Sequence, residues 1–241
     1  MKSTENFSSH EALKIGEGFR PLSGLIYRRA LRSIASSFSP YHPVTIGEVR
    51  LSKGERSCSD RWEIIEREIV SSKAATMLDL GCAEGYFVQQ AALLCDCVAL
   101  GVDGDIRRLT LAQGSILLNR VKNAGFLYAD ISPDLMTRLP KSDLVLFQSV
   151  LHHILYNKGI DYARDVMVCL RSIVGKVLIF DMGQSNETNN TWASSLPDMG
   201  PTPHLWIEEF LCSAGYTSVE KLGDTDSYRS ATKRALFRLT C

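Results

Sequence analysis

The stretch Thr76 to Phe87, TMLDLGCAEGYF, decides the fold that the sequence predicts. Its first five residues form a short apolar run, which is typical of a buried parallel strand. A turn bracketed by Gly81 and Gly85 follows. Apolar residues at helical spacing then indicate a helix; they are Tyr86, Phe87, Ala91, Ala92 and Leu94. Strand, glycine turn and helix together bring the backbone and a helix N-terminus close to a nucleotide.

The ligand expected at this turn is a cationic nucleoside. Asp79 and Glu84 put negative charge where the pyrophosphate of a dinucleotide would sit, and like charges repel. S-adenosylmethionine, which carries a sulfonium cation, suits these surroundings better. A plain strand-to-helix turn, with glycines that only reverse the chain, is the alternative interpretation of this one stretch.

Two further strands favour the nucleoside site. Val98 to Val102 is predicted as a strand that ends at Asp103, at the position where an acidic residue binds ribose hydroxyls, roughly twenty residues after the glycine turn. Gly125 to Ala129 is predicted as a third strand, which ends at Asp130. Packing does not explain two successive strands that each end in aspartate. We therefore expect S-adenosylmethionine as the cofactor.

Strands and helices alternate through the middle of the chain. Asp143 to Phe147 and Lys176 to Asp181 are predicted strands, with a helix from about Gly159 to Val174 between them. This alternation predicts an α/β fold with a doubly wound, mostly parallel sheet. Tyr216 to Gly223 and Arg234 to Thr240 are predicted to form a C-terminal antiparallel hairpin.

An N-terminal arm, residues 1–59, is expected to precede the main domain, residues 60–241. Leu22 to Phe38 predicts an amphipathic helix, with Arg28, Arg29 and Arg32 along its flank and no acidic residue. Two interpretations stay open. The helix packs on the domain or covers the site, or it makes a peripheral contact with an anionic membrane.

Composition narrows the class of protein. Lys plus Arg and Asp plus Glu number 27 each, so no global basic field favours nucleic acid, although a local basic patch would still allow it. Seven scattered cysteines, a polar N-terminus and no long apolar run favour a cytoplasmic protein. The inner face of a membrane is the alternative location.

The segment after the fourth predicted strand is expected to carry chemistry, because ligands of open α/β sheets bind at the carboxyl ends of strands. His152 or His153 is a candidate general base for a hydroxyl acceptor, and the sequence does not separate the two. Alternatively, the pair only fixes the loop. A phosphate acceptor is already an anion and needs cationic positioning alone. Gln148 is predicted to contact the cofactor, and we expect no metal.

The stretch from Met182 to Pro203 is long for a loop of a compact domain, and such loops are usually functional or disordered. Glu187 and Trp192 lie in it, and His204 follows directly. An aromatic face combined with polar groups suits a sugar-like acceptor, so these three residues are the predicted substrate contacts. Alternatively, the tryptophan only packs the loop down.

Several motifs carry a resemblance to a known family. MLDLGCAEG from Met77, the acidic strand end at Asp103 and YADI from Tyr128 resemble class I S-adenosylmethionine-dependent methyltransferases. DRWEII, SVLHHILYNKGID and DTDSYRSATKRALFRL are similar to the methyltransferase portion of bacterial O-antigen chain-terminating methyltransferase/kinases. The likeness spans most of Asp60 to Leu239 and implies a Rossmann-like, seven-stranded sheet. It departs at Ala83, where a glycine is usual, and the kinase and coiled-coil parts are absent.

The resemblance also implies roles for single residues. Asp103 would hold the ribose, Asp130 with Ile131 would frame the adenine, and Gly81 would contact the methionine portion. Arg61 would bind the methionine carboxylate, a task that suits a bidentate guanidinium. The other predicted cofactor contacts are Asp79, Ala83, Gly85 and Gln148.

The expected function is that of an S-adenosylmethionine-dependent methyltransferase, which O-methylates a glycan, a sugar phosphate or a related small molecule. An RNA methyltransferase, acting on tRNA or a 5′-phosphate, is the alternative; the segment Arg28 to Arg32 and the tail residues Arg229, Lys233 and Arg234 support it. A non-enzymatic binding module on the same fold is a second alternative, supported only by Ala83. The oligomeric state is left open.

Overall fold

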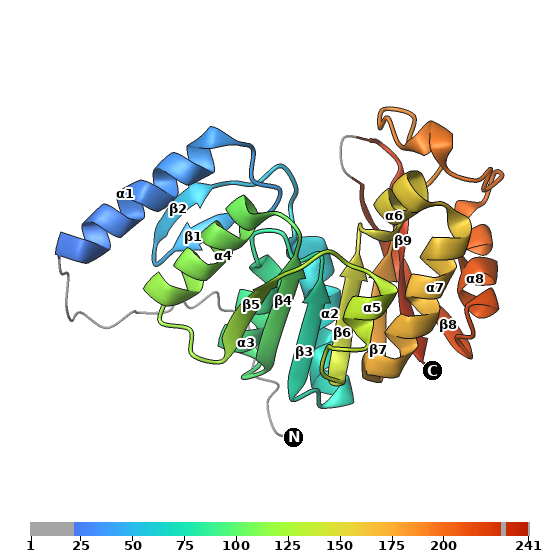
Figure 1. Cartoon of the computed structure of the whole chain (residues 1–241), viewed down its shortest axis with the longest axis horizontal. Helices are drawn as coiled ribbons and strands as arrows, with labels where there is room; N and C mark the ends of the chain where they lie inside the picture. The colour runs from blue at the N-terminus through green and yellow to red at the C-terminus, as the bar shows by residue number, and fades with distance from the viewer. Residues whose placement is uncertain (1–21, 228–229, 241) are drawn as a thin grey trace, which may run out of the picture.

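The computed structural model describes residues 22–227 and 230–240. Its centre is a seven-stranded sheet in the order β5-β4-β3-β6-β7-β9-β8, parallel from β5 to β7, with β9 antiparallel to both of its neighbours (Figure 1). The strands are β3 (Thr76–Leu80), β4 (Val98–Asp103), β5 (Ala124–Tyr128), β6 (Ser142–Gln148), β7 (Val174–Asp181), β8 (Ser218–Asp226) and β9 (Lys233–Thr240). The predicted fold, including the C-terminal antiparallel hairpin, is confirmed.

Helices cover both faces of the sheet because its central strands are apolar on both sides. Val145 and Phe147 of β6 belong to one core cluster, whereas Leu144 and Leu146 belong to the other, as the period of two along a strand requires. The helices are α2 (Ser59–Ser72), α3 (Tyr86–Leu94), α4 (Ile106–Leu118), α5 (Pro133–Met136), α6 (Leu151–Lys158), α7 (Ile160–Leu170) and α8 (Pro203–Ser213). The first cluster includes residues of α5 to α8, and the second includes residues of α2 and α3.

The described part of the N-terminal arm packs beside α4. It consists of α1 (Leu22–Ser37) and a small antiparallel hairpin of β1 (Val44–Ile46) and β2 (Val49–Ser52), which the sequence analysis does not predict (Figure 1). Leu31 of α1 is buried in a third apolar cluster with residues of β1 and α4. Leu31 and Ala35 of the apolar stripe of α1 are thus buried inside the molecule, as the packed interpretation expects.

The N-terminal end of α1 differs from the rest of the helix. Leu25 and Ile26 are 53% and 64% exposed there. No helix in the described ranges is both long and apolar enough to cross a bilayer. Contact with a membrane surface through α1 stays a prediction.

The chain after α1 crosses the edge of the sheet where the strands end. The backbone N–H groups of Tyr41 and His42 donate to the Glu84 carboxylate at 3.0 and 2.7 Å, and Arg108 pairs with the same carboxylate at 2.7 Å. The sequence analysis expected the negative charge of Glu84 to face the ligand. In the structure Glu84 instead anchors the arm to the glycine turn, and its charge is neutralised by Arg108.

Candidate active site

A cavity of about 1000 Å³ lies at the carboxyl ends of the strands, where the glycine turn, the loop after β6 and the N-terminal arm meet. Most of the site residues predicted from sequence line it. They are Arg61, Asp79, Gly81, Ala83, Asp103, Asp130, Ile131, Gln148, His152, His153 and Trp192. Gly85, Glu187 and His204 are not among the lining residues.

The glycine turn leaves no room for a side chain at Gly81 or Gly85. Gly81 has φ +83, and a Cβ there would lie 2.3 Å from Val150 Cγ2, so only glycine is accommodated. Gly85 has φ +72, precedes α3 and packs so tightly on Phe126 that a Cβ would lie 2.5 Å from its ring. Gly85 therefore has a packing role beside the cavity.

Ala83 occupies the middle of the turn with a left-handed backbone, φ 49. An L-residue with a side chain pays roughly 1–2 kcal/mol for this conformation. Its N–H donates to Asp103 Oδ2 at 2.8 Å. The alanine is thus compatible with the turn at the expense of backbone strain.

The two aspartates that follow β4 and β5 line one cavity with the glycine turn. Asp103 accepts from the N–H groups of Ala83 and Asp105, both at 2.8 Å, and burial raises the pKa of its carboxyl. A carboxylate oxygen has two lone pairs, so each can accept a further hydroxyl. Asp130 is more exposed, and a Cβ on the neighbouring Gly104 would lie 2.8 Å from its Oδ1. Both carboxylates thus line the same cavity, and their roles at ribose and adenine stay predictions.

Asp79 lies in the wall of the cavity. Its side chain is buried, and its Oδ2 has no hydrogen-bond partner among the described residues. Burial, and then the nearby charge of Asp103, raise the pKa of Asp79 to about 8. A cation beside it would restore the carboxylate.

Buried polar atoms without a partner are concentrated around this cavity. Native proteins leave few such atoms, so a group of them calls for an explanation. Within residues 22–227 and 230–240, those on lining side chains are His42 Nδ1, Arg56 Nε, Arg61 Nη1, Asp79 Oδ2 and both amide atoms of Gln148. The set combines donors and acceptors, as the amino-acid end of S-adenosylmethionine requires. Asp79 and Gln148 suit its ammonium group, and Arg61 suits its carboxylate.

Arg61 lies in the first turn of α2 and is only 2% exposed. Its Nε donates to Asp181 Oδ2 at 2.9 Å, and its Nη2 lies at the same distance from that oxygen. The remaining nitrogen, Nη1, is 3.8 Å from the Asp60 carboxylate, beyond hydrogen-bonding distance. Arg61 is held firmly, with one nitrogen left for a ligand.

The structure separates the two histidines. His152 is buried, and its Nδ1 accepts the Gly183 N–H at 3.0 Å. Burial holds its pKa well below 6.5, so the ring is neutral and carries its proton on Nε2, as a donor. His153 is the more exposed ring. Desolvation, followed by the charge of Arg234, lowers its pKa as well. His153 is therefore the histidine able to accept a proton at neutral pH.

Trp192 lines the cavity beside His152. Its ring centroid lies 4.3 Å from that of His152, and the Arg234 guanidinium lies 5.6 Å from the indole. Glu187 is fully buried, and its carboxylate accepts hydrogen bonds from Nε and Nη2 of Arg234 at 2.7 and 2.8 Å. It supports a lining arginine from behind, so its direct contact with a substrate stays a prediction.

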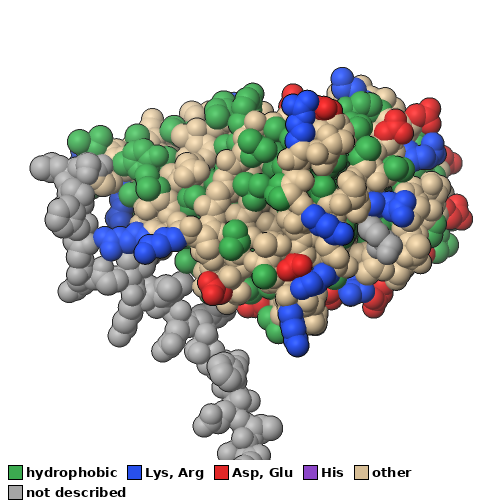
Figure 2. All heavy atoms as spheres, turned by 60° about the horizontal axis from the view of Figure 1, so that its bottom comes forward, with side chains coloured by type: hydrophobic (Ala, Val, Ile, Leu, Met, Phe, Trp, Pro, Cys, Tyr) green, Lys and Arg blue, Asp and Glu red, His purple; other side chains and the backbone are tan. Residues whose placement is uncertain are grey.

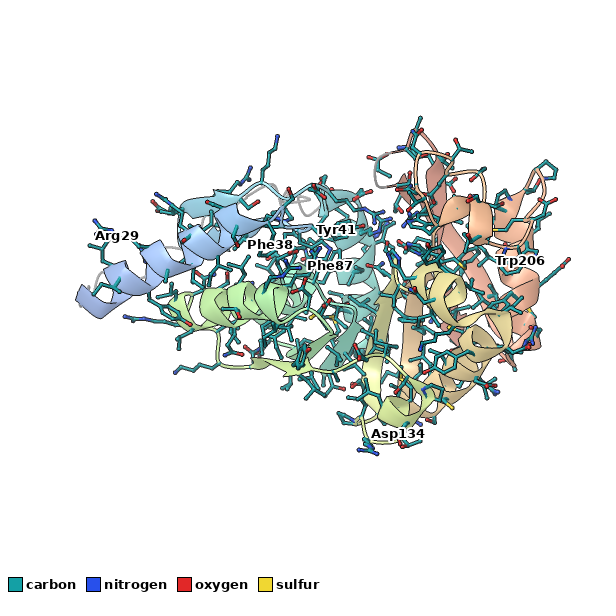
Figure 3. All side chains as sticks on the ribbon, turned by 45° about the horizontal axis from the view of Figure 1, so that its top comes forward. Arg29, Phe38, Tyr41, Phe87, Asp134 and Trp206 are labelled. Carbon is teal, nitrogen blue, oxygen red and sulfur yellow. The ribbon has the colours of Figure 1, made fainter. Side chains whose placement is uncertain are left out.

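The remaining predicted residue, His204, is half-buried at the start of α8. Trp206, on the same helix, stacks on Phe210 with ring centroids 5.4 Å apart. Figure 3 shows Trp206 at the far side of the molecule from Tyr41 and Phe87, which lie close together near its centre and line the cavity. A role for His204 in binding a substrate also stays a prediction.

The lining residues that the sequence analysis did not single out as site residues include Tyr41, Arg56, Ser149 and Arg234. Arg56 donates to Tyr41 Oη at 2.6 Å and to Ser149 Oγ at 2.9 Å, so it joins the arm to the loop after β6. Ser149 has φ 59, a left-handed conformation. The motif DTDSYRSATKRALFRL contains Arg234, but no local pattern marks Arg56.

The described residues hold no group of three or more His, Cys, Asp or Glu side chains placed to bind a metal ion.

Comparisons with known proteins agree with this geometry. Residues 71–173 match the model of a family described as a methyltransferase domain. No curated protein sequence matches the chain.

Solved structures with the same fold cover most of the chain. The crystal structure of WbdD, described as a bifunctional kinase-methyltransferase, is 21% identical over 87% of this chain, with a TM-score of 0.72. The N-terminal domain of EvdMO1, solved in the presence of SAH and D-fucose, is 17% identical over 88% of this chain, with a TM-score of 0.62. The chain covers 46% of the WbdD chain and 96% of the EvdMO1 domain.

Proposed function

Since residues 71–173 form a methyltransferase domain of the class I fold, we propose that the protein O-methylates a sugar-like acceptor: a glycan, a sugar phosphate or a related small molecule. The family match bears out the predicted class, an S-adenosylmethionine-dependent methyltransferase, and weakens the alternative of a non-enzymatic binding module. The acceptor is the proposal. The observation that carries it is the end of the cavity formed by His152, His153, Trp192 and Arg234.

The lining of the cavity divides into two parts. Pockets for one small ligand measure roughly 300–1000 Å³, and this cavity of about 1000 Å³ lies at the top of that range. The acidic strand ends Asp103 and Asp130 line one part, and the histidines with Trp192 line another. A nucleoside in the first part leaves room for a small acceptor in the second.

The residues of the second part suit transfer to a hydroxyl oxygen. S-adenosylmethionine supplies an electrophilic methyl group when bound. His153, neutral at pH 7, accepts the proton of the acceptor hydroxyl, which makes the oxygen a better nucleophile. His152 donates a hydrogen bond from Nε2 and thereby orients the acceptor. Trp192 offers an apolar ring face to the C–H face of a sugar.

The structural neighbours support the same acceptor class. The EvdMO1 domain was solved with D-fucose present, and a 6-deoxy sugar has both hydroxyls and an apolar face. WbdD combines a kinase with a methyltransferase, and this chain spans less than half of its length. We carry over only the sugar-like chemistry and leave the kinase aside.

The RNA alternative loses part of its support. Arg234 is 1% exposed and paired with Glu187, so it offers no charge to an RNA backbone. Arg229 lies outside the described residues. On the face drawn in Figure 2, basic and acidic side chains are mixed toward the right-hand end, and a group of basic side chains lies at the left-hand end, where α1 lies. Membrane contact through α1 and a cytoplasmic location stay predictions.

A labelled-methyl transfer screen tests the proposal. The full chain is incubated with S-adenosylmethionine carrying a ¹⁴C-methyl group and, in parallel, with neutral hexoses and 6-deoxyhexoses, sugar phosphates, oligosaccharides and transfer RNA. We expect label to be transferred to one of the sugar acceptors, where NMR would identify it as an O-methyl group. Label in RNA alone, or in none of the arms while the cofactor binds, would contradict the proposed acceptor.

A further inference from the structure

We propose that Arg56 and Arg61 together form a binding site for an oxyanion, a carboxylate or a phosphate, in the wall of this cavity. The inference rests on the proposed function in one respect: it takes this cavity as the ligand site. It brings a residue of the N-terminal arm, Arg56, into the binding machinery.

The two guanidinium groups lie next to each other. Nη2 of Arg61 donates to the Asp226 backbone carbonyl at 3.2 Å, and Nη2 of Arg56 donates to the same oxygen. Arg56 comes from the arm, Arg61 from α2 and Asp226 from the end of β8. Two cations that converge on one carbonyl repel each other, so an anion between them stabilises the arrangement.

Each arginine also has a nitrogen without a partner. Arg56 is 6% and Arg61 is 2% exposed, and both line the cavity. Nε of Arg56 and Nη1 of Arg61 are buried and receive no hydrogen bond acceptor from the described residues. Leaving a buried charged donor unsatisfied is costly, so these nitrogens indicate an acceptor that a ligand brings.

The charges of the arginines in this part of the cavity also favour a bound anion. Arg61 is paired with Asp181, and Arg234 is paired with Glu187. The side-chain partners of Arg56 are the neutral hydroxyls of Tyr41 and Ser149, and no carboxylate of the described part of the chain lies within 4.0 Å of it. A buried charge is tolerated when it is paired, and a bound oxyanion supplies the missing partner.

Two sources can deliver this oxyanion. One is the carboxylate of the cofactor's methionine moiety, which the family resemblance assigns to Arg61 alone. The other is an anionic group on the acceptor. Both present oxygen pairs that match the fork of a guanidinium, so binding measurements must distinguish them.

The first arm of the test is calorimetry with S-adenosylhomocysteine and its decarboxylated analogue, which keeps the amine. For Arg56→Gln we expect the affinity for S-adenosylhomocysteine to fall by about 10- to 100-fold, with the affinity for the analogue unchanged within about twofold. Arg56→Lys keeps the charge, loses the fork and should give an intermediate loss. Arg29→Gln, on the outer side of α1 (Figure 3), is the matched control and should change neither affinity.

The second arm uses inorganic phosphate with the protein saturated by S-adenosylhomocysteine. If Arg56→Gln leaves the first affinities intact but abolishes a phosphate-dependent rise in the melting temperature, the oxyanion belongs to the acceptor. If Arg56→Gln and Arg56→Lys change neither the ratio of the two cofactor affinities nor the phosphate effect, the inference is overturned. The ratio is measured within one variant, so a loss of stability does not obscure it. Neither arm needs methyl transfer, so failure of the proposed acceptor would be seen separately.

Discussion

At the scale of single residues, Asp79 binds a proton at neutral pH when no ligand is present, because its pKa is about 8 in the folded chain and 3.8 as a model value. A folded-state pKa above the unfolded value means that this residue's contribution to stability is full below about pH 4 and is lost as the pH rises through about 8.

Asp79→Asn mimics the neutral form. The ligand-free variant should therefore melt above the wild type at pH 8–9, with the difference shrinking toward pH 5. S-adenosylmethionine should raise the melting temperature of the wild type more than that of the variant, because only the wild type gains a carboxylate beside a cation. Thermal unfolding across pH, with and without cofactor, measures both effects. A variant that melts below the ligand-free wild type at pH 9 would contradict this assignment.

His153 is expected to act as the base, because its pKa is lowered and its neighbour His152 already uses Nδ1 as an acceptor. The rate with a hydroxyl acceptor should fall as the pH drops through the lowered pKa of His153, below 6.5, and level off above it. His153→Gln should reduce this rate by about 10²–10⁴-fold and remove the acidic limb of the pH profile. Arg29→Gln, at an exposed position of α1, is the control and should leave both unchanged. An unaltered profile in His153→Gln would instead favour an acceptor that is already an anion.

Ala83 is strained, since its φ of 49 lies in the left-handed region. Ala83→Gly should relieve on the order of 1 kcal/mol and raise the melting temperature by about 2–4 °C, with cofactor binding at least as tight. Ala92→Gly, at a buried position inside α3, should lower the melting temperature, because glycine there only weakens a helix. Scanning calorimetry of both variants decides the point; a lower melting temperature for Ala83→Gly would show that the alanine is not strained.

At the scale of elements, much of the fold could be predicted because its signals are local. The strand Thr76–Leu80 is found with the predicted bounds, and Asp103 ends β4 as expected. The β1–β2 hairpin was missed because strands of three and four residues carry almost no periodicity.

The site was less predictable, since its key contacts join distant parts of the chain. Arg56 reaches Ser149, 93 residues away, and nothing near Arg56 in the sequence indicates this. Glu187 was predicted as a substrate contact, but it lies behind the lining residue Arg234 and does not line the cavity itself. Its sequence context could not show that Arg234, 47 residues later, neutralises it from behind.

The loop after β7 provides a test that separates the two ends of the cavity. A Cβ on Gly183 would lie 2.3 Å from the Trp192 ring and 2.9 Å from His152 Cγ. Gly183→Ala should therefore displace both rings and raise the KM for the acceptor about tenfold or more. The Kd for S-adenosylmethionine should stay within about twofold.

Gly223→Ala is the matched control, because a Cβ at that position meets nothing within 4 Å. It should change neither constant. Steady-state kinetics and calorimetry on the two variants give the comparison. A Gly183→Ala variant that loses cofactor affinity and keeps its acceptor KM would place Trp192 and His152 at the cofactor end instead.

At the scale of the whole molecule, the cavity is polarised. Asp79, Asp103 and Asp130 line the part formed by the glycine turn, β4 and β5, whereas Arg56 and Arg234 line the part formed by the arm and β9. Tyr41 and His42, held by Glu84, close the cavity from the arm. The acidic part, which Arg108 of α4 also lines, suits the cationic S-adenosylmethionine, and the part with Arg234 is the one proposed for the acceptor.

The most direct test of the account is calorimetric titration of S-adenosylmethionine into Asp103→Ala and, as a control, Asp134→Ala, an exposed carboxylate on α5 (Figure 3). Both variants should keep the wild-type circular dichroism spectrum. The account predicts that Asp103→Ala loses measurable binding and that Asp134→Ala binds like the wild type. Undiminished binding by folded Asp103→Ala would contradict the claim that the aspartate at the end of β4 holds the nucleoside.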